Sequence, residues 1–216
     1  ILVGLVGSEM CIRDRPESLR KYTKYRFVTA AQKVLDEHEL LHHDYISTTK
    51  HLGSIHFNQG SESSRSSATS YALTNCVSTL IEIRGVGIGR TSFKRRIQSA
   101  FLISLAYLKT AYDNSDELKI EIVKAEEAQV NVALKTKRKV YKDTIRTIDL
   151  DKNEAINFEV TIRDALQLQL LKERPRPFAY FILPKEKAII DRLKILGIDL
   201  LLLEEEKEFE VQSYTV

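Results

Sequence analysis

Residues 77–89 have the sequence VSTLIEIRGVGIG, and the fold class can be inferred from this stretch. Its first part, residues 77–83, is a short run rich in β-branched residues, which predicts a strand. Three glycines follow at positions 85, 87 and 89 and give the backbone the freedom needed for a turn. Ser92 can then cap a helix that runs to about Tyr112. A strand, a glycine turn and a helix in this order predict an α/β fold.

Two helices are predicted on either side of a polar segment. Apolar residues recur at helical spacing between Pro16 and Glu39, and again beyond Ser92. The second helix has a strongly periodic apolar face, the pattern of a helix packed on a core. This face consists of Phe93, Ile97, Ala100, Phe101, Ser104, Leu105 and Leu108. Residues 47–70 are rich in Ser, Thr, Gly, Asn and Gln, which predicts a long loop.

The pattern changes near residue 115. Short alternating runs at residues 118–123, 129–134, 140–148 and 155–162 predict an antiparallel sheet. A strand at 177–183, a helix at 185–196 that Gly197 stops, and a strand at 198–203 are predicted after it. We therefore expect one domain over residues 16–115 and a smaller, strand-rich accessory domain over residues 116–216, incomplete in this chain.

Composition excludes several classes of protein. The 216 residues carry 33 basic and 30 acidic side chains, and a net charge of +3 does not indicate a nucleic-acid partner. The two cysteines, Cys11 and Cys76, match no metal-binding spacing. No run approaches the roughly 18 apolar residues of a membrane span.

The first 15 residues are interpreted as a segment foreign to the protein. Met10 to Arg15, MCIRDR, can be encoded by a sequence that resembles the transposon end ligated to fragments during sequencing-library preparation. The alternative is a signal peptide, but the short apolar run at residues 1–6 has no basic leader and no small-residue cleavage site. We expect the chain to be a fragment.

Glu82 is the candidate functional residue of the predicted strand. A lone carboxylate in an apolar strand is costly to bury, so it is expected to be either paired or catalytic. Arg84 lies two residues further on and therefore on the same face of a strand, where it could form an ion pair with Glu82. Both interpretations remain open on these grounds.

Residues 70–96, SYALTNCVSTLIEIRGVGIGRTSFKRR, resemble the C-terminal part of the catalytic domain of zinc carboxypeptidases related to carboxypeptidase A, particularly the large bacterial members. Residues 174–184, RPRPFAYFILP, resemble the segment that follows this domain in the bacterial members. The resemblance implies a zinc-dependent enzyme that hydrolyses the C-terminal bond of a peptide substrate. It also suggests export to the periplasm or the extracellular space.

The resemblance also implies roles for individual residues. Glu82 would be the general base that activates the attacking water. Arg65, in the polar stretch before the strand, would line the pocket for the C-terminal side chain and favour an acidic one, although an exposed loop arginine is the alternative. The family's zinc ligands, a His-x-x-Glu pair and a later His, precede the glutamate strand, and this sequence contains no His-x-x-Glu. We therefore expect the zinc ligands to be missing from this chain, which would bind no catalytic zinc and be inactive alone.

Two alternatives remain. The sequence His38-Glu39-Leu40-Leu41-His42 matches the H-E-x-x-H of zincin endopeptidases, in which a helix places both imidazoles on one face as zinc ligands. Charged neighbours such as Asp36 and Asp44 favour instead a solvated helix end with surface histidines. The other alternative is a non-catalytic binding module in which the strand that carries Glu82 is only scaffold.

Overall fold

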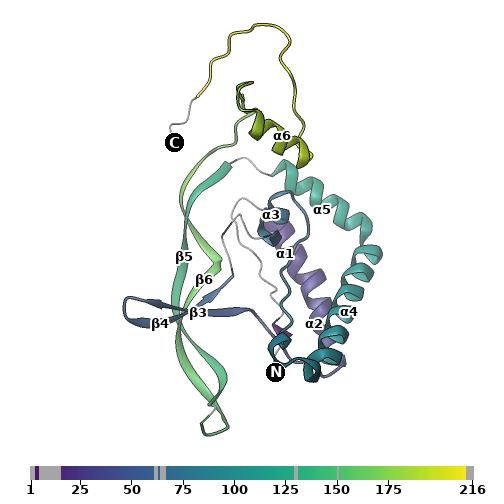
Figure 1. Cartoon of the computed structure of the whole chain (residues 1–216), viewed down its shortest axis with the longest axis vertical. Coiled ribbons are helices and arrows are strands. Elements are labelled where there is room, and N and C mark those ends of the chain that lie inside the picture. Colours follow the sequence, from purple (N-terminus) through teal and green to yellow (C-terminus); the bar gives the residue numbers. More distant parts are fainter. Residues whose placement is uncertain are drawn as a thin grey trace. The chain divides into compact units, whose positions relative to one another are not determined.

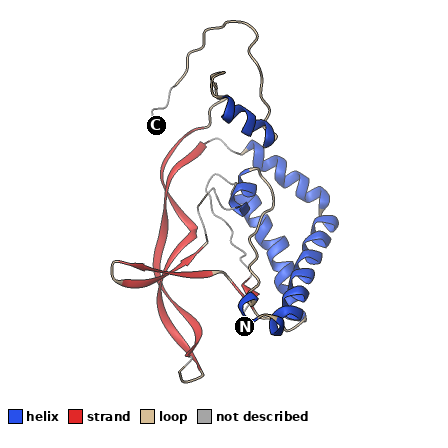
Figure 2. Cartoon of the chain, in the orientation of Figure 1, coloured by secondary structure: helices blue, strands red, loops and turns tan. Residues whose placement is uncertain are grey.

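The structure is a computed structural model that describes residues 3–4, 16–60, 63, 67–128, 131–149 and 151–212. The chain divides into two compact units, Ile1–Arg176 and Pro177–Val216. The first unit contains helices that pack on one another and one mixed sheet of four strands (Figures 1 and 2). The predicted α/β class is therefore confirmed. The domain division near residue 115 remains a prediction, and residues 1, 2 and 5–15 of the predicted foreign segment lie outside the described residues.

The predicted helix over residues 16–39 is confirmed. It consists of α1 (Glu17–Tyr22), a π-helical turn η1 (Thr23–Val28) and α2 (Thr29–Glu37), which follow one another without a break. The Thr29 hydroxyl donates a hydrogen bond to the carbonyl oxygen of Lys24, five residues back, at 3.0 Å. The wider turn places Phe27 in a cluster of buried residues with Leu19 and Tyr22.

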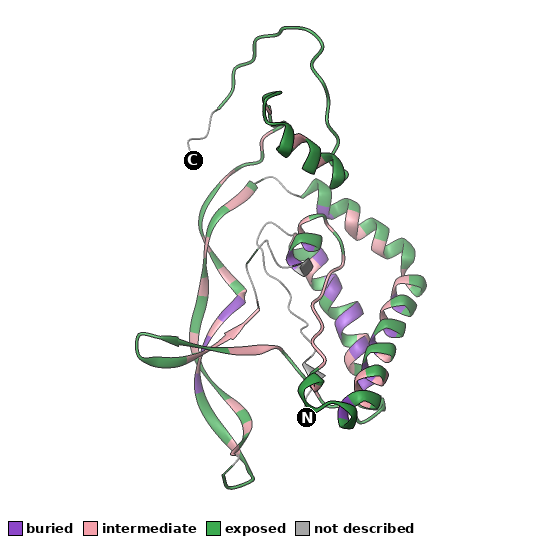
Figure 3. Ribbon diagram, in the orientation of Figure 1, coloured by how far each residue is buried: buried purple, intermediate pink, exposed green. Residues whose placement is uncertain are grey.

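The predicted helix after the glycine turn is α4 (Arg90–Asp113), but its buried face is not the predicted one. The large apolar residues of the predicted face are mostly exposed (Figure 3). The buried face consists of Ser92, Ser99, Ile103, Ala106 and Thr110. Four of these five residues are small, which lets α4 approach α2 closely, and Ile103 packs against Ala31 and Leu35.

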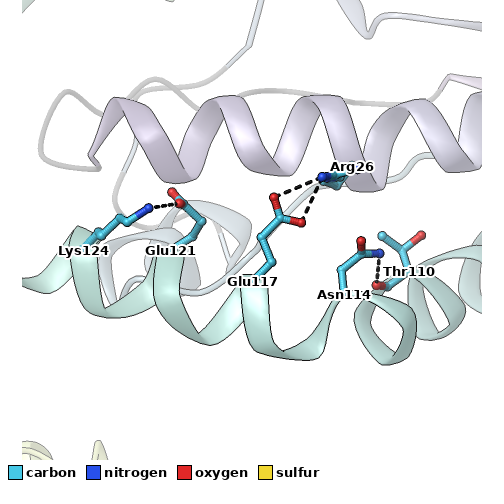
Figure 4. Close-up of polar contacts among 6 residues, drawn as sticks. All are labelled: Arg26, Thr110, Asn114, Glu117, Glu121 and Lys124. Atoms are coloured by element: carbon cyan, nitrogen blue, oxygen red, sulfur yellow. Dashed lines mark hydrogen bonds and ion pairs between the residues drawn. The ribbon is translucent and has the colours of Figure 1, made fainter.

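The strand predicted at residues 118–123 is wrong, because these residues belong to a helix, α5 (Ser115–Glu127). Leu118, Ile122 and Ala125 follow one another at helical spacing and pack into the same cluster as Phe27. Asn114 separates α4 from α5, and its side-chain amide donates a hydrogen bond to the carbonyl oxygen of Thr110 at 2.8 Å (Figure 4).

An ion pair joins α5 to the π-helical turn. Arg26 Nη2 lies 3.0 Å from both carboxylate oxygens of Glu117 (Figure 4). One turn further along α5, Lys124 Nζ lies 2.7 Å from Glu121 Oε1. Both pairs are partly exposed to solvent, so we expect each to contribute little to stability.

The long loop predicted at residues 47–70 is wrong for its first half and for its end, which begins helix α3 (Ser67–Leu73), whereas residues 61, 62 and 64–66 lie outside the described residues. Its first half forms a hairpin of β3 (Ile46–His51) and β4 (Ser54–Gln59). The two turn residues, Leu52 and Gly53, both have positive φ, 49° and 82°, which matches the twist of a two-residue hairpin. A polar composition did not exclude strands here, because none of the side chains of β3 and β4 is fully buried.

The antiparallel sheet predicted from residue 129 onward is confirmed as one long hairpin of β5 (Asn131–Asp149) and β6 (Glu154–Pro175). Strand β4 adds to β6 in parallel, and the sheet order is β3-β4-β6-β5. The hairpin register shifts between Arg138 and Lys139, opposite the most buried part of β6.

A buried carboxylate marks this shift in register. Asp164 is 2% exposed and accepts hydrogen bonds from the backbone N–H of Leu166 at 2.7 Å and from Gln167 Nε2 at 2.8 Å. The Tyr141 hydroxyl donates a third at 3.4 Å. Because buried polar groups need partners, Asp164 stabilises the shifted register and with it the junction of β4 and β6.

We predict that Asp164→Ala lowers the free energy of unfolding by about 1–3 kcal/mol, because it leaves the partly buried N–H of Leu166 without this acceptor. Asp151→Ala, at an exposed turn position, is the control and should change the free energy of unfolding by less than about 0.5 kcal/mol. Urea denaturation of both variants measures the difference. Equal effects would show that Asp164 does not support the sheet.

The second unit contains helix α6 (Lys187–Ile195), and Gly197 follows it with φ of 73°, so this predicted helix and its stop are confirmed. The strands predicted at residues 177–183 and 198–203 are wrong, because the structure gives both segments irregular backbone. A strand needs a neighbour for its N–H and C=O groups. Within this unit Phe181 instead contacts Phe209, with ring centroids 4.6 Å apart.

None of the helices among the described residues is both long enough and apolar enough to cross a membrane.

Candidate functional site

The segment that carries Glu82 runs alongside the helices, and alternate residues of it face them. Ile81 and Ile83 pack against the cluster of Ala31, Leu35 and Ile103. Val77 packs against the neighbouring cluster around Phe27, and the Thr79 hydroxyl lies 2.8 Å from that of Tyr107 on α4. The odd-numbered positions from 77 to 83 thus form one contact face, the period of an extended strand.

The segment nevertheless forms no strand ladder within the described part of the chain. Of these residues only Glu82 takes part in a β-bridge, and that bridge is isolated. The prediction of a paired strand over residues 77–83 is therefore wrong. The alternation of side chains expected of a strand is nevertheless present, because the odd-numbered residues pack one side of the segment on the helices.

Glu82 lies between Ile81 and Ile83, which pack on the helices, so it belongs to the opposite side of the segment. It is half-buried. Arg84 is exposed, and no salt bridge joins it to Glu82. The structural interpretation of Glu82 as the partner of Arg84 is therefore not supported. The catalytic role of Glu82 remains a prediction.

The glycine turn after Glu82 is held by two side chains of α4. Arg95 Nη2 donates a hydrogen bond to the carbonyl oxygen of Arg84 at 2.6 Å. The Ser92 hydroxyl lies against the carbonyl oxygens of Gly85 and Gly89, to either of which it can donate. Ser92 is therefore not the helix cap that the sequence predicts: Gly89 is the N-cap residue, and Ser92 instead fixes the turn.

Gly85 cannot be replaced in this turn without strain. Its φ is 118°, and a Cβ built on it would lie 2.7 Å from Arg95 Nη2 and 2.8 Å from Ser92 Cβ. The close approach of α4 and the positive φ both require glycine. The sequence contains no local signal for the Arg95 contact, because Arg95 binds a backbone carbonyl eleven residues away.

We predict that Gly85→Ala lowers the free energy of unfolding by about 1–3 kcal/mol, because alanine is strained at this φ and crowds Arg95. Gly87→Ala is the matched control. Gly87 has no positive φ and open space around it, so its replacement should be neutral or stabilising by up to about 1 kcal/mol. Urea denaturation compares the two variants, and equal stability would contradict the role of the turn.

Tyr107 connects the segment to the helices. Its ring lies 5.3 Å from that of Phe27 between centroids, and its hydroxyl bonds to that of Thr79. Burial raises the pKa of Tyr107 above its usual value near 10, and the hydrogen bond to Thr79 opposes this shift. The folded chain therefore keeps this phenol neutral at a pH where the unfolded chain ionises it.

The raised pKa of Tyr107 predicts that the folded chain loses stability as the pH rises above about 10, since the unfolded state then binds fewer protons. Tyr107→Phe should remove this part of the alkaline loss. At pH 7 it should lower the free energy of unfolding by about 0.5–1.5 kcal/mol through the missing bond to Thr79. Urea denaturation from pH 7 to pH 11 measures both effects. Tyr112→Phe, on the same helix but 84% exposed, should leave both unchanged.

The H-E-x-x-H sequence does not lie on a helix. Helix α2 ends at Glu37, His38 is its C-cap, and Glu39 has φ of 55°. His38 Nδ1 lies 2.9 Å from the carbonyl oxygen of Val34, whereas His42 belongs to the short strand β2 (His42–His43), which pairs in parallel with β1 (Val3–Gly4). The zincin arrangement of His38 and His42 is therefore wrong, because the chain leaves the helix between the two imidazoles.

His42 instead pairs with a carboxylate at the helix end, Nε2 lying 3.0 Å from Asp36 Oδ1. Across the described residues, no group of three or more His, Cys, Asp or Glu side chains could hold a metal ion. These residues thus do not fit a catalytic zinc ion. Arg65 lies outside the described residues.

Comparison with known proteins relates the chain to carboxypeptidases. It is 28% identical over 130 residues to the probable carboxypeptidase 2 of Trichophyton verrucosum and to that of Arthroderma benhamiae, which is 58% of this chain and 25% of each relative. The match to carboxypeptidase 2 of Trichophyton rubrum has the same identity. The chain thus spans about a quarter of the length of these relatives. No family model and no solved structure matches.

Proposed function

We propose that this chain is part of a zinc-dependent carboxypeptidase in which Glu82 is the general base for hydrolysis of the C-terminal bond of a peptide. The placement of Glu82 is the observation that carries this proposal. The carboxylate is half-buried, free of Arg84, and attached to a segment that the helices hold on its other side. The similarity to fungal carboxypeptidases supports the same class of reaction.

A general base needs a fixed position and a carboxylate oxygen that can accept a proton. Ile81 and Ile83 anchor the backbone on both sides of Glu82, and Arg95 fixes the turn that follows it. No ion pair with Arg84 occupies the carboxylate oxygens of Glu82. The arrangement therefore favours proton transfer by Glu82 over a purely structural role.

Zinc would supply the Lewis acid of this reaction. Because the described residues do not fit a zinc site, we propose that the ligands belong to parts of the enzyme outside this sequence. Arg65 is proposed to lie near the C-terminal side chain of the substrate and to favour an acidic one.

The test is the product of the full-length gene that encodes this sequence. We expect it to contain a His-x-x-Glu pair and a later His before Pro16 and to release C-terminal residues from peptides. Glu82→Gln in that protein should lower kcat by about 10²–10⁴-fold with little change in KM. Glu126→Gln, at an exposed position of α5, is the matched control and should keep full activity.

Circular dichroism must show that both variants are folded. Full activity of a folded Glu82→Gln variant would overturn the role of Glu82. A full-length gene without the histidine and glutamate ligands would overturn the zinc carboxypeptidase itself and favour a non-catalytic binding module.

A further inference from the structure

The outer strand of the sheet, β5, has a basic middle section. Residues 135–142, KTKRKVYK, contain five basic residues and no acidic one. Lys135, Lys137 and Lys139 alternate along the strand, so they lie on the same side of the sheet, and all three are exposed. Alternate residues of a strand are about 7 Å apart. These three side chains thus form a regular row of positive charges, which we call the lysine row.

No carboxylate of the described residues forms a salt bridge with the lysine row. The salt bridge of this section joins Lys142 to Glu159 at 3.5 Å. Lys139 lies opposite Asp164 in the register, but its Nζ donates a hydrogen bond to Gln167 Oε1 at 2.8 Å instead. The charge of the row is therefore not balanced by ion pairs within the described part of the chain.

Protection of a sheet edge does not account for all of the positive charge. Lysines on an edge strand hinder the pairing of two such edges, which is a common reason for their presence. Lys172, however, belongs to the inner strand β6, is exposed, and lies directly opposite Lys135. Like charges in opposite positions of neighbouring strands destabilise a sheet, and a lysine on β6 does not protect the edge of β5. This pair of lysines thus indicates a surface that binds negative charge.

The backbone of β5 favours a peptide strand as the carrier of that charge. Strand β5 ends the sheet order, and among the strands of the described residues it pairs with β6 alone, so its other edge presents unpaired N–H and C=O groups. Between Lys135 and Asp149 every extra residue of the irregular pairing lies on β6, so the open edge of β5 contains no insertion. A nucleic acid could neutralise the lysine row but has no peptide groups to pair with this edge.

We propose that β5 binds an extended acidic peptide as an additional strand at its open edge, with a carboxylate at every second position of the peptide facing the lysine row. The side chains of an added strand have the same spacing as the row. Main-chain hydrogen bonds hold the peptide, and opposite charges across the pair of strands select its sequence. This proposal does not depend on the proposed function.

Fluorescence anisotropy of labelled probes with the 216-residue chain tests the surface. A nonapeptide of alternating Thr and Glu should bind, and the binding should weaken as the salt concentration rises. The same peptide N-methylated along its backbone keeps its charges but has no N–H groups to donate, so its Kd should be at least about tenfold higher. Oligothymidylate has negative charge but no peptide backbone, and it should also bind at least about tenfold more weakly than the nonapeptide.

Charge reversal tests the role of the lysine row. A variant that combines Lys135→Glu, Lys137→Glu and Lys139→Glu should raise the Kd of the nonapeptide at least about tenfold, because like charges then face each other across the two strands.

The matched control changes the net charge by the same amount at exposed lysines outside β5. It combines Lys50→Glu, Lys94→Glu and Lys187→Glu. Because distant exposed charges are screened, its Kd for the nonapeptide should stay within about twofold of that of the unchanged chain.

A chain that does not bind the nonapeptide would overturn the proposal. Equal affinity for the N-methylated peptide would overturn the added strand, since charge alone would then explain the binding. Oligothymidylate that binds as tightly as the nonapeptide would overturn the peptide as partner in favour of a nucleic acid. Circular dichroism confirms that both variants are folded, and the N-methylated probe tests the open edge with the chain itself unchanged.

Discussion

The close packing of α2 on α4 is the interaction on which the helical part of this chain depends. Small residues of α4, such as Ser99 and Ala106, let the two helices approach, and Ile103 fills the space between Ala31 and Leu35. Ile81 and Ile83 complete the same core from the side. Because these residues alternate along an extended segment, the core also determines that Glu82 lies on the opposite side of that segment.

The glycine turn fixes the backbone that follows Glu82 against helix α4, in addition to the packing of Ile81 and Ile83 on the core. Gly85 has a backbone conformation that other residues rarely adopt, and it lies against Ser92 and Arg95 of α4. The backbone around Glu82 is thus fixed before and after the carboxylate, by apolar packing on one side and by hydrogen bonds on the other. A residue that transfers protons requires such a fixed position. The chain is 28% identical to fungal carboxypeptidases over 58% of its length, and the role of Glu82 as a general base is our proposal.

The same packing explains the surface that the helices leave open. Helix α4 has two faces that could be buried, one with large apolar residues and one with small residues around Ile103. Packing with α2 uses the small face, so large side chains such as Phe101 remain in solvent. The exposed apolar face of α4 is therefore a consequence of how the core is formed.

The sequence by itself determined the helix over residues 17–37, the helix that begins at Arg90, the β5–β6 hairpin and the stop of α6 at Gly197. Local periodicity and glycine conformation are sufficient for these features. It also identified Glu82 as a lone carboxylate in an apolar run.

Tertiary structure decided what local patterns leave ambiguous. Residues 118–123 fit either a strand or a helix, and packing of Leu118 and Ile122 on the core selected the helix. The two histidines of H-E-x-x-H do not share a helix face, because α2 ends at Glu37. The face that α4 buries depends on its neighbour α2, because contact with another element, and not periodicity alone, determines which face is removed from water.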